Sequence, residues 1–94
     1  MQVQNMESSK GNKIPNQFII ITDNGVQYFQ SYTSIIVKFE PSFNSDIKAK
    51  IVLDKTYWNY SVTTSKYRNK FLNETKSETE KKIKSGQYIL ADLN

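Results

Sequence analysis

The sequence predicts an α+β domain with the element order β-β-β-β-α-α-β, in which two short helices from the C-terminal half lie on one face of an antiparallel sheet of four to five strands. Two observations lead to this prediction. Residues 17–53 contain short runs rich in β-branched and aromatic side chains, which are typical of strands. From residue 61 onward, these runs give way to hydroxyl-rich helix starts and to apolar side chains at helical spacing.

The N-terminal segment, residues 1–14, is expected to be a flexible tail that ends before Pro15. It is polar and shows no apolar periodicity, so nothing in it offsets the entropy lost on ordering. A chain of 94 residues suffices for one compact domain and is too short for two. Residues 15–94 are therefore expected to form a single α+β domain.

The first four strands are predicted from side-chain type and alternation, at residues 17–22, 26–31, 35–40 and 49–53. Asn24-Gly25 lies between the first two strands and indicates a two-residue type I′ turn, in which both central residues have positive φ. Such a turn would pair Ile21 with Tyr28. Because both faces of this hairpin carry apolar side chains, the hairpin is expected to be central in the sheet.

Two helices are predicted after the strands, the first at residues 65–72 and the second ending at Lys84. The hydroxyls of Ser61–Thr64 can cap the first helix, and whether they cap it or contact a partner stays open. Thr75 and Glu78 fit a capping box at the start of the second helix. The segment 87–90 is the predicted final strand.

The charge is unevenly distributed. Residues 1–47 carry three basic and four acidic side chains, net −1, whereas residues 48–94 carry ten basic and five acidic ones, net +5. A basic half-domain favours an anionic partner, either nucleic acid or an acidic protein surface. The alternative is that a modest net charge of +4 keeps a small domain in solution.

The residue types present limit the possible chemistry. The chain has no Cys and no His, which excludes disulfides, zinc–thiolate sites and His-based catalytic triads. Glu40, Asp46 and Lys48 show an acid-acid-Lys spacing that is also found in metal-dependent nucleases. Here the spacing lies in the loop predicted at residues 41–46 rather than on adjacent strands, and so short a pattern has a high false-positive rate. Catalytic residues, metal ligands and cofactors are therefore not predicted, and the protein is not expected to be an enzyme.

One constellation combines aromatic and cationic side chains between residues 55 and 70. Aromatic rings that stack on bases and cations that contact phosphates are what single-strand binders need. The alternative is that the aromatics fill the core while the cations lie on a solvated helix face. The candidate binding residues are Lys55, Tyr57, Trp58, Tyr60, Lys66, Arg68 and Lys70.

Two stretches of the chain resemble a family of small uncharacterised proteins of phages and other mobile elements. They are Phe29-Gln30-Ser31-Tyr32 and the hydroxyl-rich Tyr60-Ser61-Val62-Thr63-Thr64-Ser65-Lys66. The resemblance implies a short accessory protein, and such proteins often bind host machinery.

The expected function is therefore a non-enzymatic binding protein that inhibits or modifies a host protein or nucleoprotein complex, for example a CRISPR-type defence complex. The alternative is a domain that binds single-stranded RNA or DNA directly. The longest apolar run, Phe18–Ile21, is far shorter than the roughly 20 residues that span a bilayer, and the sequence shows no secretion signal. A cytoplasmic location in the host cell is expected.

Overall fold

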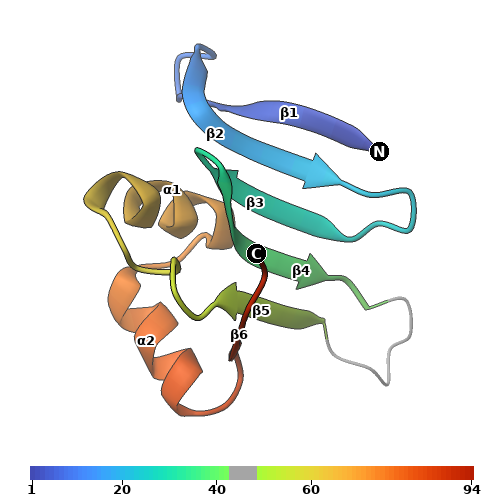
Figure 1. The fold of residues 1–94 in the computed structure, drawn as a ribbon. Helices are drawn as coiled ribbons and strands as arrows, with labels where there is room; N and C mark the ends of the chain where they lie inside the picture. The colour runs from blue at the N-terminus through green and yellow to red at the C-terminus, as the bar shows by residue number, and fades with distance from the viewer. Residues whose placement is uncertain (43–48) are drawn as a thin grey trace.

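A computed structural model describes residues 1–42 and 49–94, and in these residues it shows an α+β fold with a six-stranded sheet (Figure 1). The strands are β1 (Gln2–Glu7), β2 (Lys13–Ile21), β3 (Gln27–Ser31), β4 (Ser34–Glu40), β5 (Lys50–Asp54) and β6 (Ile89–Ala91), and the helices are α1 (Val62–Leu72) and α2 (Lys76–Lys84). The predicted fold class is confirmed. Most of the predicted loop 41–46 lies outside the described residues, and so do Asp46 and Lys48.

The strands follow one another across the sheet in chain order, β1-β2-β3-β4-β5-β6. Each neighbouring pair from β1 to β5 is antiparallel, as predicted for the pairs from β2 to β5, whereas β6 runs parallel to β5. The connections fit this difference: a short turn can join antiparallel strands only, and the chain between β5 and β6 passes through both helices, which supplies the long crossover that a parallel pair requires. In Figure 1, the two helices lie together beside the sheet, with β1 at the far edge.

The expected tail is the largest error of the sequence-based prediction. Residues 2–7 form β1, which pairs with β2 from Gln2↔Ile21 to Asn5↔Phe18. Met6 is 4% exposed and belongs to the core. A polar segment with a single apolar anchor is ordered here because β2 satisfies its backbone groups, which is a long-range contact that composition does not reveal.

The β2–β3 hairpin differs from the prediction in its turn and register. Thr22 N–H donates to the Val26 carbonyl at 2.9 Å and Gly25 N–H to the Thr22 carbonyl at 3.0 Å, which closes a three-residue loop. Gly25 has φ +83°, as expected, whereas Asn24 is not among the residues with positive φ, so the turn is not type I′. As a result, Ile21 pairs with Gln27 rather than with Tyr28.

The core lies between the sheet and the helices. Phe29, Val37 and Leu53 are fully buried at the centre of β3, β4 and β5. The ring of Phe71 in α1 stacks on that of Phe29, with centroids 5.8 Å apart. The predicted inward face of the first helix is thereby confirmed, although the helix begins at Val62, three residues earlier than expected.

The described residues contain no helix that is long and apolar enough to cross a membrane. They also contain no cluster of three or more acidic side chains that could hold a metal ion.

Candidate binding surface at the start of α1

The start of α1 is fixed by hydroxyl groups. Ser61 is the N-cap, and its Oγ accepts the Thr64 N–H at 3.1 Å. The Thr64 side chain is fully buried, and its Oγ1 lies 2.9 Å from Ser31 Oγ on β3. Of the hydroxyls in Ser61–Thr64, one therefore caps the helix, as predicted, and another joins the helix to the sheet.

An open hollow of about 610 Å³ lies beside this helix start. We call it the α1 hollow. It is bordered by the residues before α1, by one side of α1 and by the first residue of α2. Its lining residues are Asn59, Tyr60, Ser61, Val62, Ser65, Lys66, Asn69 and Lys76.

The charged groups of the α1 hollow are both cationic. Lys66 comes from α1 and Lys76 from α2, and each is exposed. Lys76 also lies 3.7 Å from Glu80, but both side chains are about half exposed, so this pair is weak. The first turn of α1 contains no acidic residue. The positive end of the helix dipole therefore adds to the two ammonium groups, and the hollow has the electrostatic character of an anion site.

Tyr60 gives the α1 hollow an exposed aromatic ring. Tyr60 is 51% exposed, and its ring meets that of Tyr57 edge-on, with centroids 5.4 Å apart. Tyr57 is half-buried and packs against the core, so it holds the Tyr60 ring from one side. Val62 at the first helical position is 88% exposed. A planar ring and an apolar side chain thus border a cationic hollow, which suits a ligand that has both an anionic and a flat apolar part.

Arg68, one of the candidate binding residues, does not lie on the surface, unlike its neighbours Lys66 and Lys70. Its side chain is fully buried, with the guanidinium carbon 5.2 Å from the centre of the Trp58 ring. The guanidinium donates to the Trp58 carbonyl and to Asn69 Oδ1. The helical spacing that points Tyr67 inward also points its neighbour Arg68 beneath the 57–60 segment.

Burial lowers the pKa of Arg68 from its usual value, while Glu74 and Glu80 favour the charged form. Arginine nevertheless stays charged at neutral pH. Its Nε has no acceptor among the described residues. Arg68 therefore supports the 57–60 segment from below and does not present its charge to solvent.

Asp54 holds the chain that leads from β5 toward the α1 hollow. Its carboxylate, 1% exposed, accepts N–H groups from Thr56 at 3.0 Å and Tyr57 at 2.8 Å, and it also accepts Leu93 N–H at 2.8 Å. Burial alone would raise the pKa of Asp54, but these donors, together with the amide of Asn94, outweigh it and lower the pKa. The charged carboxylate thus organises the turn that places the aromatic segment.

The seven predicted binding residues do not form one surface. Tyr60 and Lys66 line the α1 hollow, while Tyr57 and Trp58 lie partly buried beneath it. Two more are exposed elsewhere. Lys55 follows β5 directly, and Lys70 reaches across to the carbonyl of Glu7 on β1. The structure thus brings together part of the predicted set and assigns Arg68 to the interior.

Several lining residues were missed by sequence reasoning. Lys76 lies ten positions after Lys66, and Asn73 in the left-handed conformation (φ +56°) ends α1 so that α2 begins close by. The sequence did contain a signal for this proximity. Asn73 can end a helix in the left-handed conformation, and the capping box that follows it begins the next helix, so the end of α1 and the start of α2 lie close together. Asn59 and Asn69 carry no comparable signal, since polar residues of this kind are common on any helix or loop surface.

The fold and this surface together define a class: a small α+β protein with a mixed six-stranded sheet and a cationic, aromatic hollow where its first helix begins. Residues 1–87 match the model of a family of unknown function, DUF8033, and the chain belongs to that family. The match includes β1 as well as both helices. The comparisons with curated proteins and with solved structures find no match.

Proposed function

We propose that the protein is a non-enzymatic binding protein of phage or mobile-element origin that acts in the cytoplasm of a host cell. It inhibits or modifies a host nucleic-acid-processing complex, for example of the CRISPR type, by contacting the single-stranded RNA or DNA held by that complex. The phage origin rests on the sequence resemblance described above. The nucleic-acid contact rests on one observation, the α1 hollow, which is lined by the exposed Tyr60 together with Lys66 and Lys76.

Charge complementarity favours the nucleic acid over the protein part of such a complex. The protein channels that hold nucleic acid are themselves basic, and they would repel Lys66 and Lys76. A single strand instead offers phosphates to the two ammonium groups and a base to the exposed Tyr60 ring. The side-chain amides of Asn59 and Asn69 can donate hydrogen bonds to the same ligand.

The alternative function is direct binding of free single-stranded RNA or DNA without a protein target. The same hollow supports it, because stacking and phosphate contacts need no partner protein. The two functions differ in what binds first. A direct binder has high affinity and a steep salt dependence with nucleic acid alone, whereas an inhibitor binds free strands weakly and its complex stoichiometrically.

The hollow is tested by fluorescence anisotropy with a labelled single-stranded RNA of about 12 nucleotides at two salt concentrations. The double variant Lys66→Ala/Lys76→Ala is expected to weaken binding about tenfold or more and to lower the salt slope by about 1.4, because each phosphate contact on a single strand adds about 0.7. Tyr60→Ala is expected to weaken binding without changing that slope. The matched control is Lys81→Ala/Lys84→Ala, which removes two exposed lysines of α2 outside the hollow. Equal losses in the two double variants would exclude the hollow as the contact.

The two functions are separated by affinity capture from host lysate with and without nuclease treatment. Inhibition of a nucleoprotein complex predicts that a defined set of proteins is captured, that nuclease releases it, and that the hollow variant fails to capture it. Direct binding predicts tight binding to free RNA and no defined protein set. If nuclease leaves the captured proteins in place and the hollow variant captures them equally well, the proposed contact is incorrect.

A further inference from the structure

The two edge strands of the sheet, β6 and β1, differ in length and in whether neighbouring chain covers them. At one edge, β6 has three residues, and the chain after it is tied down because Asn94 bonds the backbone of Ile35 through both its Oδ1 and its Nδ2. At the other edge, β1 has six residues, and its outer side has no neighbouring strand in the described ranges 1–42 and 49–94. Its outward N–H and C=O groups are a template for another strand.

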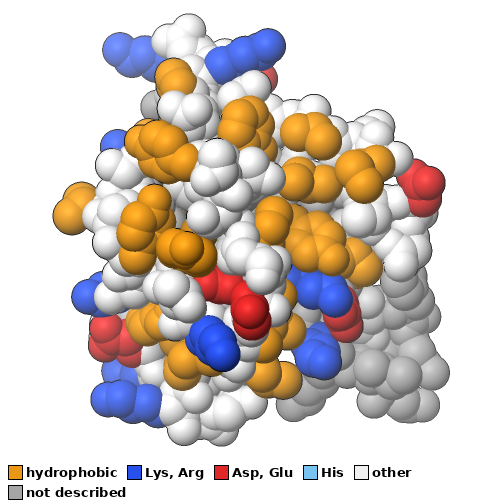
Figure 2. Space-filling model, in the orientation of Figure 1, with side chains coloured by type: hydrophobic (Ala, Val, Ile, Leu, Met, Phe, Trp, Pro, Cys, Tyr) orange, Lys and Arg blue, Asp and Glu red, His pale blue; other side chains and the backbone are white. Residues whose placement is uncertain are grey.

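Apart from its last residue Glu7, which is charged and whose carbonyl accepts from Lys70, β1 lacks the features by which edge strands usually avoid association. Residues 2–6 contain no Pro, Gly or charged residue. The register irregularity beside β1 arises from extra residues on β2, because Asn5 pairs with Phe18 and Glu7 with Lys13, so β1 itself is not bulged. Val3 is 61% exposed. Figure 2 shows hydrophobic side chains gathered over β1, β2 and β3, so this edge continues into an apolar face.

The ladder of β2 determines which groups of β1 face outward. In an antiparallel ladder, alternate residues direct their backbone groups to alternate sides. Thr22 bonds Val26 on the β3 side, so Ile19, three residues earlier, points the other way and pairs with Gln4 on β1. The backbone groups of Gln4 are thus used within the sheet. The groups left facing outward are those of the neighbouring residues Val3 and Asn5.

Two copies of β1 are compatible across a twofold axis. A residue on such an axis faces itself, so a charge there would be repelled by its own copy. The chain has a net charge of +4, yet residues 2–6 are uncharged. With Gln4 on the axis, its side-chain amide meets the same amide of the second copy, and amides can both donate to and accept from each other. Val3 then lies opposite Asn5 of the second copy, and both use their outward backbone groups.

We propose that the occupant of this edge is a second copy of the chain, paired antiparallel through β1 about a twofold axis at Gln4. The two six-stranded sheets then join into one continuous sheet. This dimer does not depend on the proposed function, since no residue of the α1 hollow lies on β1.

The dimer is tested by sedimentation equilibrium over a range of protein concentrations. The wild-type chain is expected to approach twice its mass of 10.9 kDa as concentration rises. Val3→Lys is expected to raise the dissociation constant at least tenfold, because it places charge beside the axis on both copies. The matched control Ile89→Lys alters a residue that is 46% exposed on the opposite edge and should leave dimerisation unchanged. A wild-type mass of 10.9 kDa up to about 1 mM would overturn the proposal.

A cysteine cross-link tests the register even if Val3→Lys fails to fold. The chain has no natural Cys, so a single introduced thiol is unambiguous. Directly opposed residues in an antiparallel pair have Cα atoms roughly 4.5–5.5 Å apart, which is within disulfide range. Gln4→Cys is expected to form a covalent dimer on mild oxidation far faster than Leu90→Cys, a residue that is 40% exposed on the β6 edge. Equal rates for the two variants would refute pairing at Gln4.

Discussion

The two helices of this protein begin in different ways. α1 begins with a single cap, Ser61, has no acidic residue in its first turn, and is bordered by Lys66 and an exposed Tyr60. α2 begins with a complete capping box, in which Thr75 accepts the Glu78 N–H and Glu78 in turn accepts the Thr75 N–H. The partial positive charge of α2 is therefore balanced by its own carboxylate, whereas the first turn of α1 has no carboxylate to balance it.

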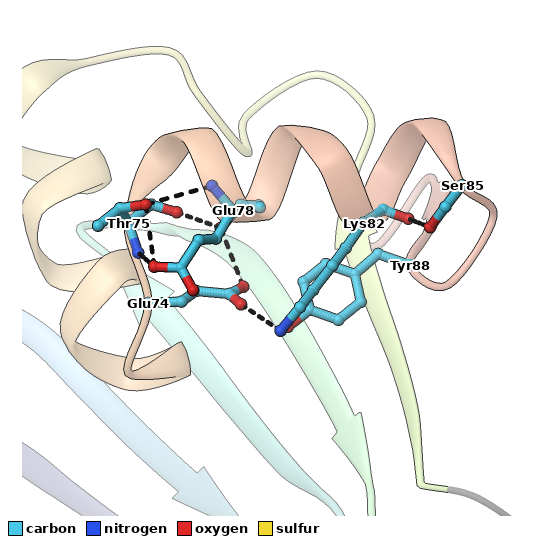
Figure 3. A network of polar contacts seen from close by, with 7 residues as sticks. Glu74, Thr75, Glu78, Lys82, Ser85 and Tyr88 are labelled. Atoms are coloured by element: carbon cyan, nitrogen blue, oxygen red, sulfur yellow. Dashed lines mark hydrogen bonds and ion pairs between the residues drawn. The ribbon is translucent and has the colours of Figure 1, made fainter.

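The start of α2 is part of a closed network (Figure 3). The Glu74 carboxylate is almost fully buried and accepts from Thr79 Oγ1 at 2.9 Å and from Lys82 Nζ at 2.6 Å. The hydrogen bond to Glu74 raises the pKa of Lys82, although burial opposes the charge. The Thr75 N–H lowers the pKa of Glu78. The charged groups in this network have partners within the molecule, so this helix start is structural.

The comparison teaches that the starts of two helices in one small domain can differ in how far their polar groups are satisfied within the molecule. At α2, polar groups satisfy one another and hold the helix in place. At α1, the stabilising polar groups Arg68 and Asp54 lie underneath, while the exposed Lys66 lies over the ring of Tyr67 and has no ion pair among the described residues. This difference can be tested by variants that affect stability at one end and binding at the other.

The largest effect is expected from Arg68→Met. This change removes the donors to the Trp58 carbonyl and to Asn69 Oδ1 in a fully buried place. We expect a loss of about 3 kcal/mol of unfolding free energy, or a fall in Tm on the order of 15 °C. Lys66→Met is the matched control, since it changes an exposed residue two positions away and should alter stability by less than about 0.5 kcal/mol. Similar melting temperatures for both variants would show that Arg68 does not support the α1 start.

Arg68 also illustrates what local patterns can and cannot predict. The inward face of α1 was predictable, because Tyr67 and Phe71 recur at i, i+4 spacing and Phe71 does stack on Phe29. The burial of Arg68 was not, since it depends on Trp58 lying across the helix ten residues earlier in the chain. A cation beside an aromatic cluster in sequence is compatible with a solvent-exposed site and with a buried stack.

The strands also show that local sequence patterns do not reveal contacts with distant parts of the chain. The central strands were found from side-chain type, and their pairing order follows from short connections. β1 could not be found in this way, because its ordering depends on β2 and on one apolar anchor, Met6. The hairpin register was off by one residue because Asn-Gly also fits a three-residue loop in which Gly25 alone is left-handed.

The second-largest effect is expected from Asp54→Asn, which should cost about 2 kcal/mol at pH 7 because the buried donors lose a charged acceptor. The fold lowers the pKa of Asp54, so folding stabilises its ionised form. This contribution is complete above the unfolded-state pKa, about 4, and is lost as pH falls through the folded-state pKa. The stability difference between wild type and variant should therefore shrink under acid conditions.

Chemical denaturation at several pH values measures this difference. Asp23→Asn is the control, because Asp23 is 94% exposed and its change should leave the pH dependence nearly intact. A gap between wild type and Asp54→Asn that stays constant from pH 7 to pH 2 would contradict the assignment.

The next prediction distinguishes the N-cap of α1, Ser61, from the N-cap of α2, Thr75, by their effects on RNA binding. Ser61→Ala and Thr75→Ala each remove a side-chain oxygen that accepts an N–H in the first helical turn. Each is expected to cost about 1 kcal/mol of stability. Ser61→Ala should in addition weaken RNA binding in the anisotropy assay, because Ser61 lines the α1 hollow and Thr75 does not. If both variants bind RNA like the wild type, the hollow does not require an ordered helix start.

The smallest effect on stability comes from giving α1 the acid that α2 already has. Val62 is the first residue of α1 and is 88% exposed, so Val62→Glu places a carboxylate at the positive end of the dipole without disturbing the core. It should stabilise the fold by roughly 0.3–1 kcal/mol at low salt, as other acids at helix starts do. The same carboxylate would occupy the border of the α1 hollow and repel phosphates, so RNA binding should fall severalfold. The control Val62→Gln introduces a side chain of nearly the same shape as Glu but without its charge, and it should leave both stability and RNA binding close to wild type. A variant that becomes more stable while binding RNA as well as the wild type would contradict the proposed role of the positive end of the α1 dipole in RNA binding.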